Sequence, residues 1–541
     1  MQKKNADTKN YGKQFFSGIA VLAISTFIVK VIGLFYKIPK IAYLVAEGMG
    51  YFNSAYDIYS LFFVISTTGI PVAISILVAE NKVQGRLKNI KRIFRVSLIA
   101  LGSLGLLGTL AMGVFHDEFA QIINNDRAAF CILAISPTLL MICLSSAIRG
   151  YFQGNQSMIP TAVSQVIEAL GKLFLGLGFA IIAINKGYDI PRVAAFAVLG
   201  LTLGVAISLL FLVLYKILYR LKSDNYELSN SEDSNGTILK KLLNIAIPIT
   251  LSSTILSLTK IIDMTMILGR LGDIGYTQGQ SNAIYGSYST MAVSIYNLPA
   301  TLISAIALPL VPLLVSAIES GDLRKEMSVL SSSLKMASLI AFPTGLGIAV
   351  FSEPILKLLF ASQEKEIEYT APLLSLLGLS VFLSAMITIT NAILQAYKQV
   401  KKPIISMAIG IVVKLIFAFL LIGIPQINIY GAPISTFVSS VVIVAFNLYF
   451  IVKRSGKIDK VYNLFGKPFL ATFLAVGIGM VLYLFLQERI NSRLLILPII
   501  VVIAMLYGIL ILKLGAINED EILMLPKGEK ILKILNKIHL V

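Results

Sequence analysis

Long apolar blocks separated by short polar stretches run along nearly the whole chain. About 20 consecutive apolar residues are needed to cross a bilayer as a helix, whereas membrane β-barrels show short alternating strands. About fourteen blocks meet the helical requirement, so the pattern predicts an all-α polytopic membrane protein. The expected spans are 15–38, 50–78, 94–115, 128–148, 160–184, 193–215, 242–269, 283–315, 330–351, 370–393, 404–424, 430–452, 468–487 and 494–512.

The basic residues between the blocks predict the orientation of the chain. Most Lys and Arg fall in the two tails and in alternate connecting segments, among them 82–95, 216–241, 398–402 and 453–467. Cytoplasmic loops of membrane proteins carry an excess of Lys and Arg, so both termini are expected in the cytoplasm. The net charge of +18 therefore follows membrane topology, and we reject nucleic acid as a partner.

Short matches in a shared order relate the two halves of the chain. Lys30 matches Lys260 and Lys172 matches Lys414, while Tyr56, Pro71 and Gly150 have counterparts at Tyr285, Pro309 and Ala396. Because each half holds an even number of spans, two parallel six-helix repeats are predicted. The expected organisation is a first repeat at 1–222, a cytoplasmic linker at 223–240, a second repeat at 241–454, two additional helices at 455–514 and an amphipathic cytoplasmic tail at 515–541.

Four lysines lie inside the apolar blocks, where a charge costs roughly 2.5–3.5 kcal/mol on insertion scales. Lys30 and Lys260 lie at similar depths in the first and seventh spans, and Lys172 and Lys414 lie in the fifth and eleventh. Lysine binds phosphate as a point charge, so these residues are candidates for an anionic substrate. Snorkelling of Lys30 and Lys260 to the outer membrane interface is the alternative.

Acidic residues accompany two of these lysines. Asp263 follows Lys260 by three residues and Glu168 precedes Lys172 by four, so each could form an ion pair on one helix face. The pair at Asp263 is interpreted either as structural or as a gate that opens when an anion competes for the lysine. The pair at Glu168 is interpreted as charge compensation, whereas Lys414 has no acid nearby in sequence.

Three further charged residues lie in or near the spans. Two of them, Asp57 and Arg270, have two possible roles each. Asp57 lies in a polar part of the second span, where it could contact substrate or pack against other helices. Arg270, at the end of the seventh span, is a ligand candidate or an interface anchor. Arg149 is expected at a cytoplasmic helix end.

Catalytic and cofactor signals are absent from the sequence. It has no G-x-x-x-x-G-K-[ST] run, and its two histidines and two cysteines do not form a metal-ligand or nucleophile pattern. We therefore expect neither an enzyme nor a cofactor, although transport could be coupled to the membrane potential or to a monovalent cation.

The architecture and three short motifs resemble the MurJ/SpoVB group of polysaccharide-precursor exporters, in the superfamily that includes the multidrug and toxin extrusion transporters. The motifs are KVIGLFYKIP at 30–39, AEGMG at 46–50 and STTGIPVAIS at 66–75. The resemblance implies a cell-membrane flippase for lipid-linked cell-wall precursors, chiefly lipid II, that works by alternating access without ATP hydrolysis. Family members have essential cavity arginines; here Lys30 occupies the first-helix position, and the second and eighth spans contain no arginine.

The expected partners are a lipid-linked oligosaccharide, membrane lipids and cell-wall synthesis proteins. Two other functions remain open at this point. A cation-coupled multidrug exporter would use carboxylates such as Asp57 and Asp263, whereas a non-transporting scaffold for cell-wall synthesis would not require paired lysines within its spans.

Overall fold

The computed structural model describes residues 2–222, 233–456, 461–490 and 492–517. Helices make up these residues almost entirely, and no strand occurs among them, so the all-α prediction is confirmed. Most of the predicted linker and of the amphipathic tail lies outside the described residues. The chain forms two compact units, residues 1–286 and 287–541.

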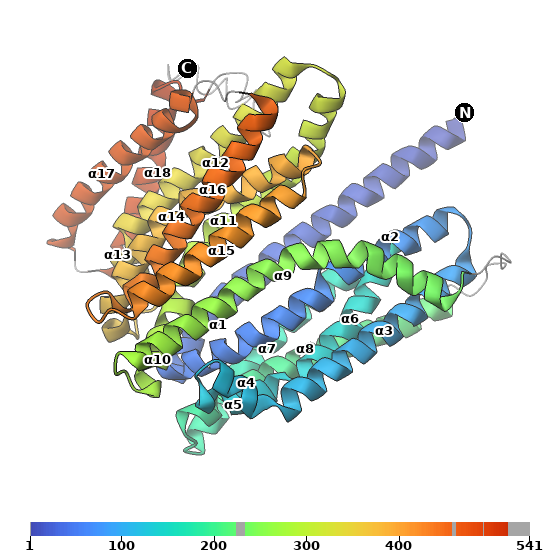
Figure 1. The fold of residues 1–541 in the computed structure, drawn as a ribbon, viewed down its shortest axis with the longest axis horizontal. Coiled ribbons are helices and arrows are strands. Elements are labelled where there is room, and N and C mark those ends of the chain that lie inside the picture. Colours follow the sequence, from blue (N-terminus) through green and yellow to red (C-terminus); the bar gives the residue numbers. More distant parts are fainter. Residues whose placement is uncertain (1, 223–232, 457–460, 491, 518–541) are drawn as a thin grey trace. The chain divides into compact units, whose positions relative to one another are not determined.

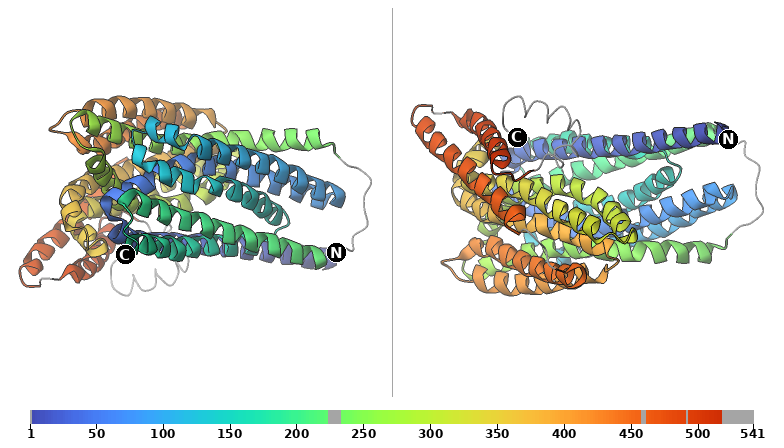
Figure 2. Two further views of the ribbon diagram at one scale, coloured as in Figure 1. Left: turned by 90° about the horizontal axis from the view of Figure 1, so that it is seen from below. Right: turned by 90° about the horizontal axis from the view of Figure 1, so that it is seen from above.

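The first unit contains ten α-helices among its described residues, which Figures 1 and 2 show in blue to green as a bundle of long helices. Helix α7 packs along α8 and against α1, and α9 packs against α1, α2 and α3. The helices are α1 (Gln2–Thr67), α2 (Gly69–Val83), α3 (Leu87–Val114), α4 (His116–Ile122), α5 (Ala129–Ile135), α6 (Pro137–Gly154), α7 (Ile159–Asn185), α8 (Ile190–Lys222), α9 (Asn235–Asp273) and α10 (Gln278–Ser287).

Helix α1 consists of two helical segments that meet at Val45. The backbone of Val45 has φ 53° and ψ 176°, which is outside the helical region and rare for a β-branched residue. The first segment runs through Pro39, where the sequence predicted a helix end, because membrane helices tolerate an internal proline. The second segment ends at Thr67, so α1 and α2 divide the second predicted span between them.

Gly69, at the first position of α2, allows α9 to cross α2 closely. A Cβ atom at this position would lie 2.3 Å from both the carbonyl oxygen of Ala246 and the hydroxyl of Thr250. Only glycine leaves room for such an approach. This contact helps to hold α9, which carries Lys260, against the helices that precede the linker.

The start of α9 is also attached to α3 by polar contacts. Asn89 accepts a hydrogen bond from the backbone of Asp233 at 3.0 Å, and Lys241 forms an ion pair with Asp233 at 2.7 Å. The hydrogen bond from Lys241 lowers the pKa of the Asp233 carboxyl. Ser234 caps the helix by accepting from the backbone N–H of Thr237.

The second unit, drawn in yellow to red in Figures 1 and 2, is also helical. Helices α11, α12, α14 and α16 enclose an apolar core, and α17 and α18 form a pair in which α17 packs on α12. A π-helical turn at Tyr288–Ala292 precedes α11 (Val293–Glu319). The other helices are α12 (Leu323–Val350), α13 (Ser352–Leu359), α14 (Glu364–Ala396), α15 (Lys401–Ile422), α16 (Gly431–Ser455), α17 (Lys467–Gln487) and α18 (Ile496–Lys513).

Eleven helical segments among the described residues are long and apolar enough to cross a membrane. Residues 31–82, which cover the end of the first predicted span and all of the second, count as one of them. Helices α9 and α11 are not included, although they occupy the seventh and eighth predicted spans. The protein is therefore a multi-pass membrane protein. The number of fourteen spans and the repeat boundaries stay predictions.

Candidate functional site

Asp57 is the centre of a group of charged residues in the first unit. The hydroxyl of Tyr285 in α10 donates a hydrogen bond to the Asp57 carboxylate. Lys37, on the first segment of α1, and both Lys260 and Asp263, on α9, lie close enough to interact electrostatically with Asp57. The structure thus brings Asp57, Lys260 and Asp263, all predicted as site residues, together from two helices that are distant in sequence.

Lys37 and Lys40 belong to this region, although the sequence interpretation had not singled them out. Lys37 interacts with both Lys260 and Asp57. Lys40 is only 3% exposed, and its ammonium lies 3.6 Å from the ring centre of Phe52 and 4.7 Å from that of Tyr36. Aromatic faces stabilise a buried ammonium in the absence of an acid. Lys37 falls in the KVIGLFYKIP motif, which is the signal that could have identified it.

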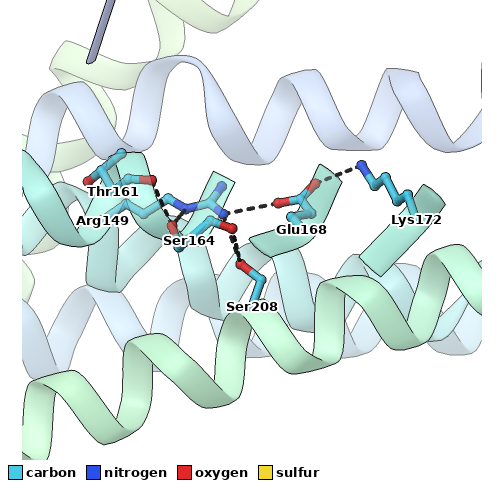
Figure 3. Close-up of polar contacts among 6 residues, drawn as sticks. All are labelled: Arg149, Thr161, Ser164, Glu168, Lys172 and Ser208. Carbon is cyan, nitrogen blue, oxygen red and sulfur yellow. Dashed lines mark hydrogen bonds and ion pairs between the residues drawn. The ribbon is translucent and has the colours of Figure 1, made fainter. Parts of the chain in front are cut away.

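A second buried group of charges connects α6, α7 and α8 (Figure 3). The guanidinium of Arg149 donates to the carboxylate of Glu168 at 3.0 Å, and the ammonium of Lys172 donates to the other oxygen of the same carboxylate at 2.7 Å. Arg149 also donates to the hydroxyls of Ser164 at 3.0 Å and Ser208 at 3.3 Å. We call Arg149, Glu168 and Lys172 the charged triad.

The spacing along α7 explains why the triad forms. Ser164, Glu168 and Lys172 are separated by four residues each, so they occupy one face of the helix, which packs against α6 and α8. The expected Glu168–Lys172 ion pair is present in the structure. Arg149 is buried near the end of α6, and its contacts with Glu168 and two serines were not predicted. Its expected place at a cytoplasmic helix end stays a prediction.

The remaining predicted site residues are placed as follows. Lys414 is buried in α15, with 6% exposure. Arg270, near the end of α9, forms an ion pair with Asp273 at 2.6 Å. The side chain of Lys30 lies outside the described residues. The roles assigned to all of these residues stay predictions. Among the described residues, no three His, Cys, Asp or Glu side chains form a metal-binding group.

The second segment of α1 packs very closely against α10 in the first unit. A Cβ atom on Gly286 would lie 2.0 Å from the carbonyl oxygen of Ala46, and a Cβ on Gly50 would lie 2.3 Å from the backbone oxygen of Asn282. Asn125 and Asn282 exchange two amide hydrogen bonds, of 2.8 and 2.9 Å, beside this crossing. The two glycines and the asparagine pair therefore form a closely packed helix contact, which we call the glycine crossing.

Gly286→Ala is expected to destabilise the glycine crossing by about 1–3 kcal/mol, because the added methyl group overlaps backbone atoms that cannot move independently. The shift should appear as a lower unfolding midpoint of the purified protein in detergent. Gly272→Ala is the matched control, since a Cβ at Gly272 meets nothing within 4 Å. Equal midpoints for the two variants would contradict the close packing.

Comparison with known proteins gives the family. The family model "Lipid II flippase MurJ" matches residues 41–503. Stage V sporulation protein B of Bacillus subtilis (strain 168) is 26% identical over 526 residues, which cover 95% of this chain and 98% of that protein. Lipid II flippase MurJ of the same organism is 25% identical over 454 residues, covering 81% of this chain and 82% of that protein.

Solved structures show the same fold. The inward closed conformation of lipid II flippase MurJ matches with a TM-score of 0.66 and 17% identity, over 91% of this chain and 98% of that one. An inward-facing multidrug resistance MATE family transporter matches with a TM-score of 0.65 and 17% identity, over 82% of this chain and 99% of that one. Since the family model covers most of the chain, the protein belongs to the lipid II flippase MurJ family.

Proposed function

We propose that the protein is a flippase that moves undecaprenyl-pyrophosphate-linked cell-wall precursor, lipid II, from the cytoplasmic to the outer leaflet by alternating access. Membership of the MurJ family and similarity to the lipid II flippase MurJ of Bacillus subtilis support this proposal. The observation that carries it is the group of Lys37, Lys260 and Asp57 in the first unit. In this group, ammonium groups from two helices lie beside a carboxylate that a phosphate group could displace from them.

This group suits a pyrophosphate headgroup for electrostatic reasons. Lysine ammonium groups bind phosphate as point charges, and unpaired charges within a membrane are costly. Without substrate, Asp57 compensates part of the positive charge of Lys37 and Lys260. A phosphate group would compete with Asp57 for the lysines, and Tyr285 would keep the released carboxylate hydrogen-bonded.

Alternating access in this proposal uses the predicted fourteen-span topology, with two parallel repeats and both termini in the cytoplasm. With this orientation, residues 46–50 lie on the outer side of the membrane, so the glycine crossing would close the first unit on that side. Release of the substrate to the outer leaflet would require this crossing to separate.

An energy source other than ATP is part of the proposal. Two charges that cross a potential of 100 mV gain or lose roughly 4.6 kcal/mol, enough to bias transport. Coupling to the membrane potential or to a monovalent cation is therefore proposed, together with contacts to membrane lipids and to cell-wall synthesis proteins. The lipid tail would remain in the bilayer while the headgroup crosses.

A cation-coupled multidrug exporter is the second candidate function, supported by the MATE fold similarity and by the carboxylates Asp57 and Asp263. Drug resistance on overproduction, with normal cell walls on depletion, would favour this function. A non-transporting scaffold would instead keep its function when Lys30, Lys172, Lys260 and Lys414 are all neutralised.

Binding of lipid II to the purified protein tests the proposed function directly. We expect specific binding that weakens at higher salt, because it depends on exposed charge. The double variant Lys30→Ala/Lys260→Ala should lose this binding, and a variant with Lys186→Ala at an exposed site should retain it. Equal binding by the double variant and the wild type would show that these lysines do not hold the headgroup.

A further inference from the structure

The charged triad carries one more positive than negative charge in a buried environment. Two cations, Arg149 and Lys172, share the single carboxylate of Glu168. The side chains of Arg149 and Glu168 are 9% and 11% exposed, and that of Lys172 is 21% exposed. A buried unbalanced charge is strongly unfavourable unless a counter-charge compensates it. The structure therefore calls for an additional negative charge beside the triad.

Hydrogen-bond donors exceed acceptors around the triad. Both carboxylate oxygens of Glu168 already accept, and the hydroxyls of Ser164 and Ser208 accept from Arg149 while they donate to backbone carbonyls. The second terminal nitrogen of Arg149 takes part in none of these contacts and points away from them in Figure 3. Only a species that accepts hydrogen bonds can satisfy the donors that remain.

Two tyrosines of α1 add buried hydroxyl donors near α7. Tyr59 is 1% exposed, and its hydroxyl has no hydrogen-bond partner among the described residues. It lies close enough to Glu168 and Arg149 for electrostatic interaction. The hydroxyl of Tyr36 is also buried without a described partner, and it faces α7 at Gly176, one turn beyond Lys172. A buried phenol normally has a partner.

We infer that Arg149 and Tyr59 bind one small monovalent anion of the chloride class within the first unit, where Lys172 supplies the excess positive charge that the anion balances. The anion neutralises the excess charge of the triad and accepts the hydrogen bonds that the protein leaves unused. The inference does not depend on the proposed flippase function, because it rests on the charge and hydrogen-bond balance of α1, α6 and α7.

Chloride-dependent stability of the full-length protein tests this inference. The unfolding midpoint is measured in detergent while chloride replaces gluconate at constant ionic strength, with no lipid substrate present. Because a ligand that binds only the folded state stabilises it by mass action, the midpoint of the wild type should rise with chloride and then saturate. The inference would be overturned if the unfolding midpoint of the wild type did not change when chloride replaces gluconate.

Variants of the triad test whether the effect of chloride on the unfolding midpoint arises at this site. Lys172→Met leaves the Arg149–Glu168 ion pair intact but removes the excess charge, so the chloride response should disappear. Lys335→Met, which removes a buried lysine from the second unit, is the matched control and should retain it. A response of Lys172→Met equal to that of the wild type would also overturn the inference.

Two further variants keep the test decisive if Lys172→Met does not fold. Tyr59→Phe preserves every charge and should weaken chloride binding about tenfold, the effect of losing one hydrogen bond to a charged group. Glu168→Gln raises the net charge and should lower the chloride concentration of half-maximal response. Opposite changes in either variant would contradict the site.

Competition with polyprenyl pyrophosphate shows whether the anion at this site is free chloride or a phosphate group of the lipid. A resident anion should leave the chloride response unchanged when polyprenyl pyrophosphate is added to saturation. Loss of the response would mean that a phosphate oxygen of the lipid takes this position, which would overturn the assignment of an independent chloride site.

Discussion

Replacing both Lys37 and Lys260 with methionine is expected to reduce lipid II transport by about 100-fold or more, since each lysine would contribute a charge-assisted contact of roughly 1.5–3 kcal/mol to the headgroup. Methionine keeps most of the length of the lysine side chain while it removes the charge. The measurement is rescue of cells depleted of their own flippase, together with the amount of lipid II exposed on the outer leaflet.

The control for this prediction must separate binding from folding. Lys186→Met removes an exposed lysine at the end of α7 and should rescue growth like the wild type. The double variant leaves Asp57 with the hydrogen bond from Tyr285 but without two cationic neighbours, so its unfolding midpoint is expected to fall modestly. Transport is therefore compared per amount of folded protein in the membrane. Full rescue by the double variant would refute the lysine site.

Single variants show how much Lys37 on α1 and Lys260 on α9 each contribute to lipid II transport. Lys260 was predicted from its place within an apolar block, whereas Lys37 follows only from the structure, which brings it next to Lys260 and Asp57. Each single replacement should give an intermediate defect if both lysines contact the same headgroup. A defect confined to Lys260 would mean that Lys37 compensates Asp57 and does not touch the substrate.

The helices and the membrane class could be predicted from the sequence, because the hydrocarbon core imposes long apolar segments whatever their packing. The break within α1 could not. Pro39 is the usual helix-breaking signal, but the chain turns at Val45, a β-branched residue that local preferences would place in a regular segment. The AEGMG motif follows Val45 directly and packs against other parts of the chain at the glycine crossing, a tertiary contact that local preferences do not reveal.

Side-chain partners across helices were the other limit of sequence reasoning. The Glu168–Lys172 pair was predictable because four residues separate its members on one helix. Arg149 was not, because its contact with Glu168 depends on how α6 rotates against α7. The same holds for Lys40, whose partners are aromatic rings and not acids. An unpaired base near an intramembrane acid is the signal that would have connected Arg149 to Glu168.

The two charged groups of the first unit differ in a way that fits separate roles. The group at Asp57 holds acids and bases from α1 and α9, and Lys260 is exposed while the other members are half-buried, so part of its charge is accessible. The charged triad is buried between α6, α7 and α8, and serine hydroxyls fix the position of Arg149. Accessible charge suits a substrate that must enter and leave, whereas buried charge suits the permanent attachment of helices.

Glu168→Leu is expected to destabilise the protein by about 3–5 kcal/mol, because it leaves Arg149 and Lys172 as adjacent buried cations without a counter-charge. The free energy of unfolding is measured by denaturant titration of purified protein in gluconate buffer, so that chloride cannot replace the missing carboxylate. Leucine is slightly larger than glutamate and leaves no cavity, so the loss should come from the missing charge and its hydrogen bonds.

A double-variant cycle separates the triad from a general effect of altering α7. Lys172→Met alone should cost little, since Arg149 still pairs with Glu168 at 3.0 Å. Adding Lys172→Met to Glu168→Leu should restore part of the lost stability, because one of the two uncompensated cations is then gone. If the two substitutions instead add independently, Lys172 and Arg149 do not share the carboxylate in energetic terms, and the excess positive charge on which the anion site rests would not exist.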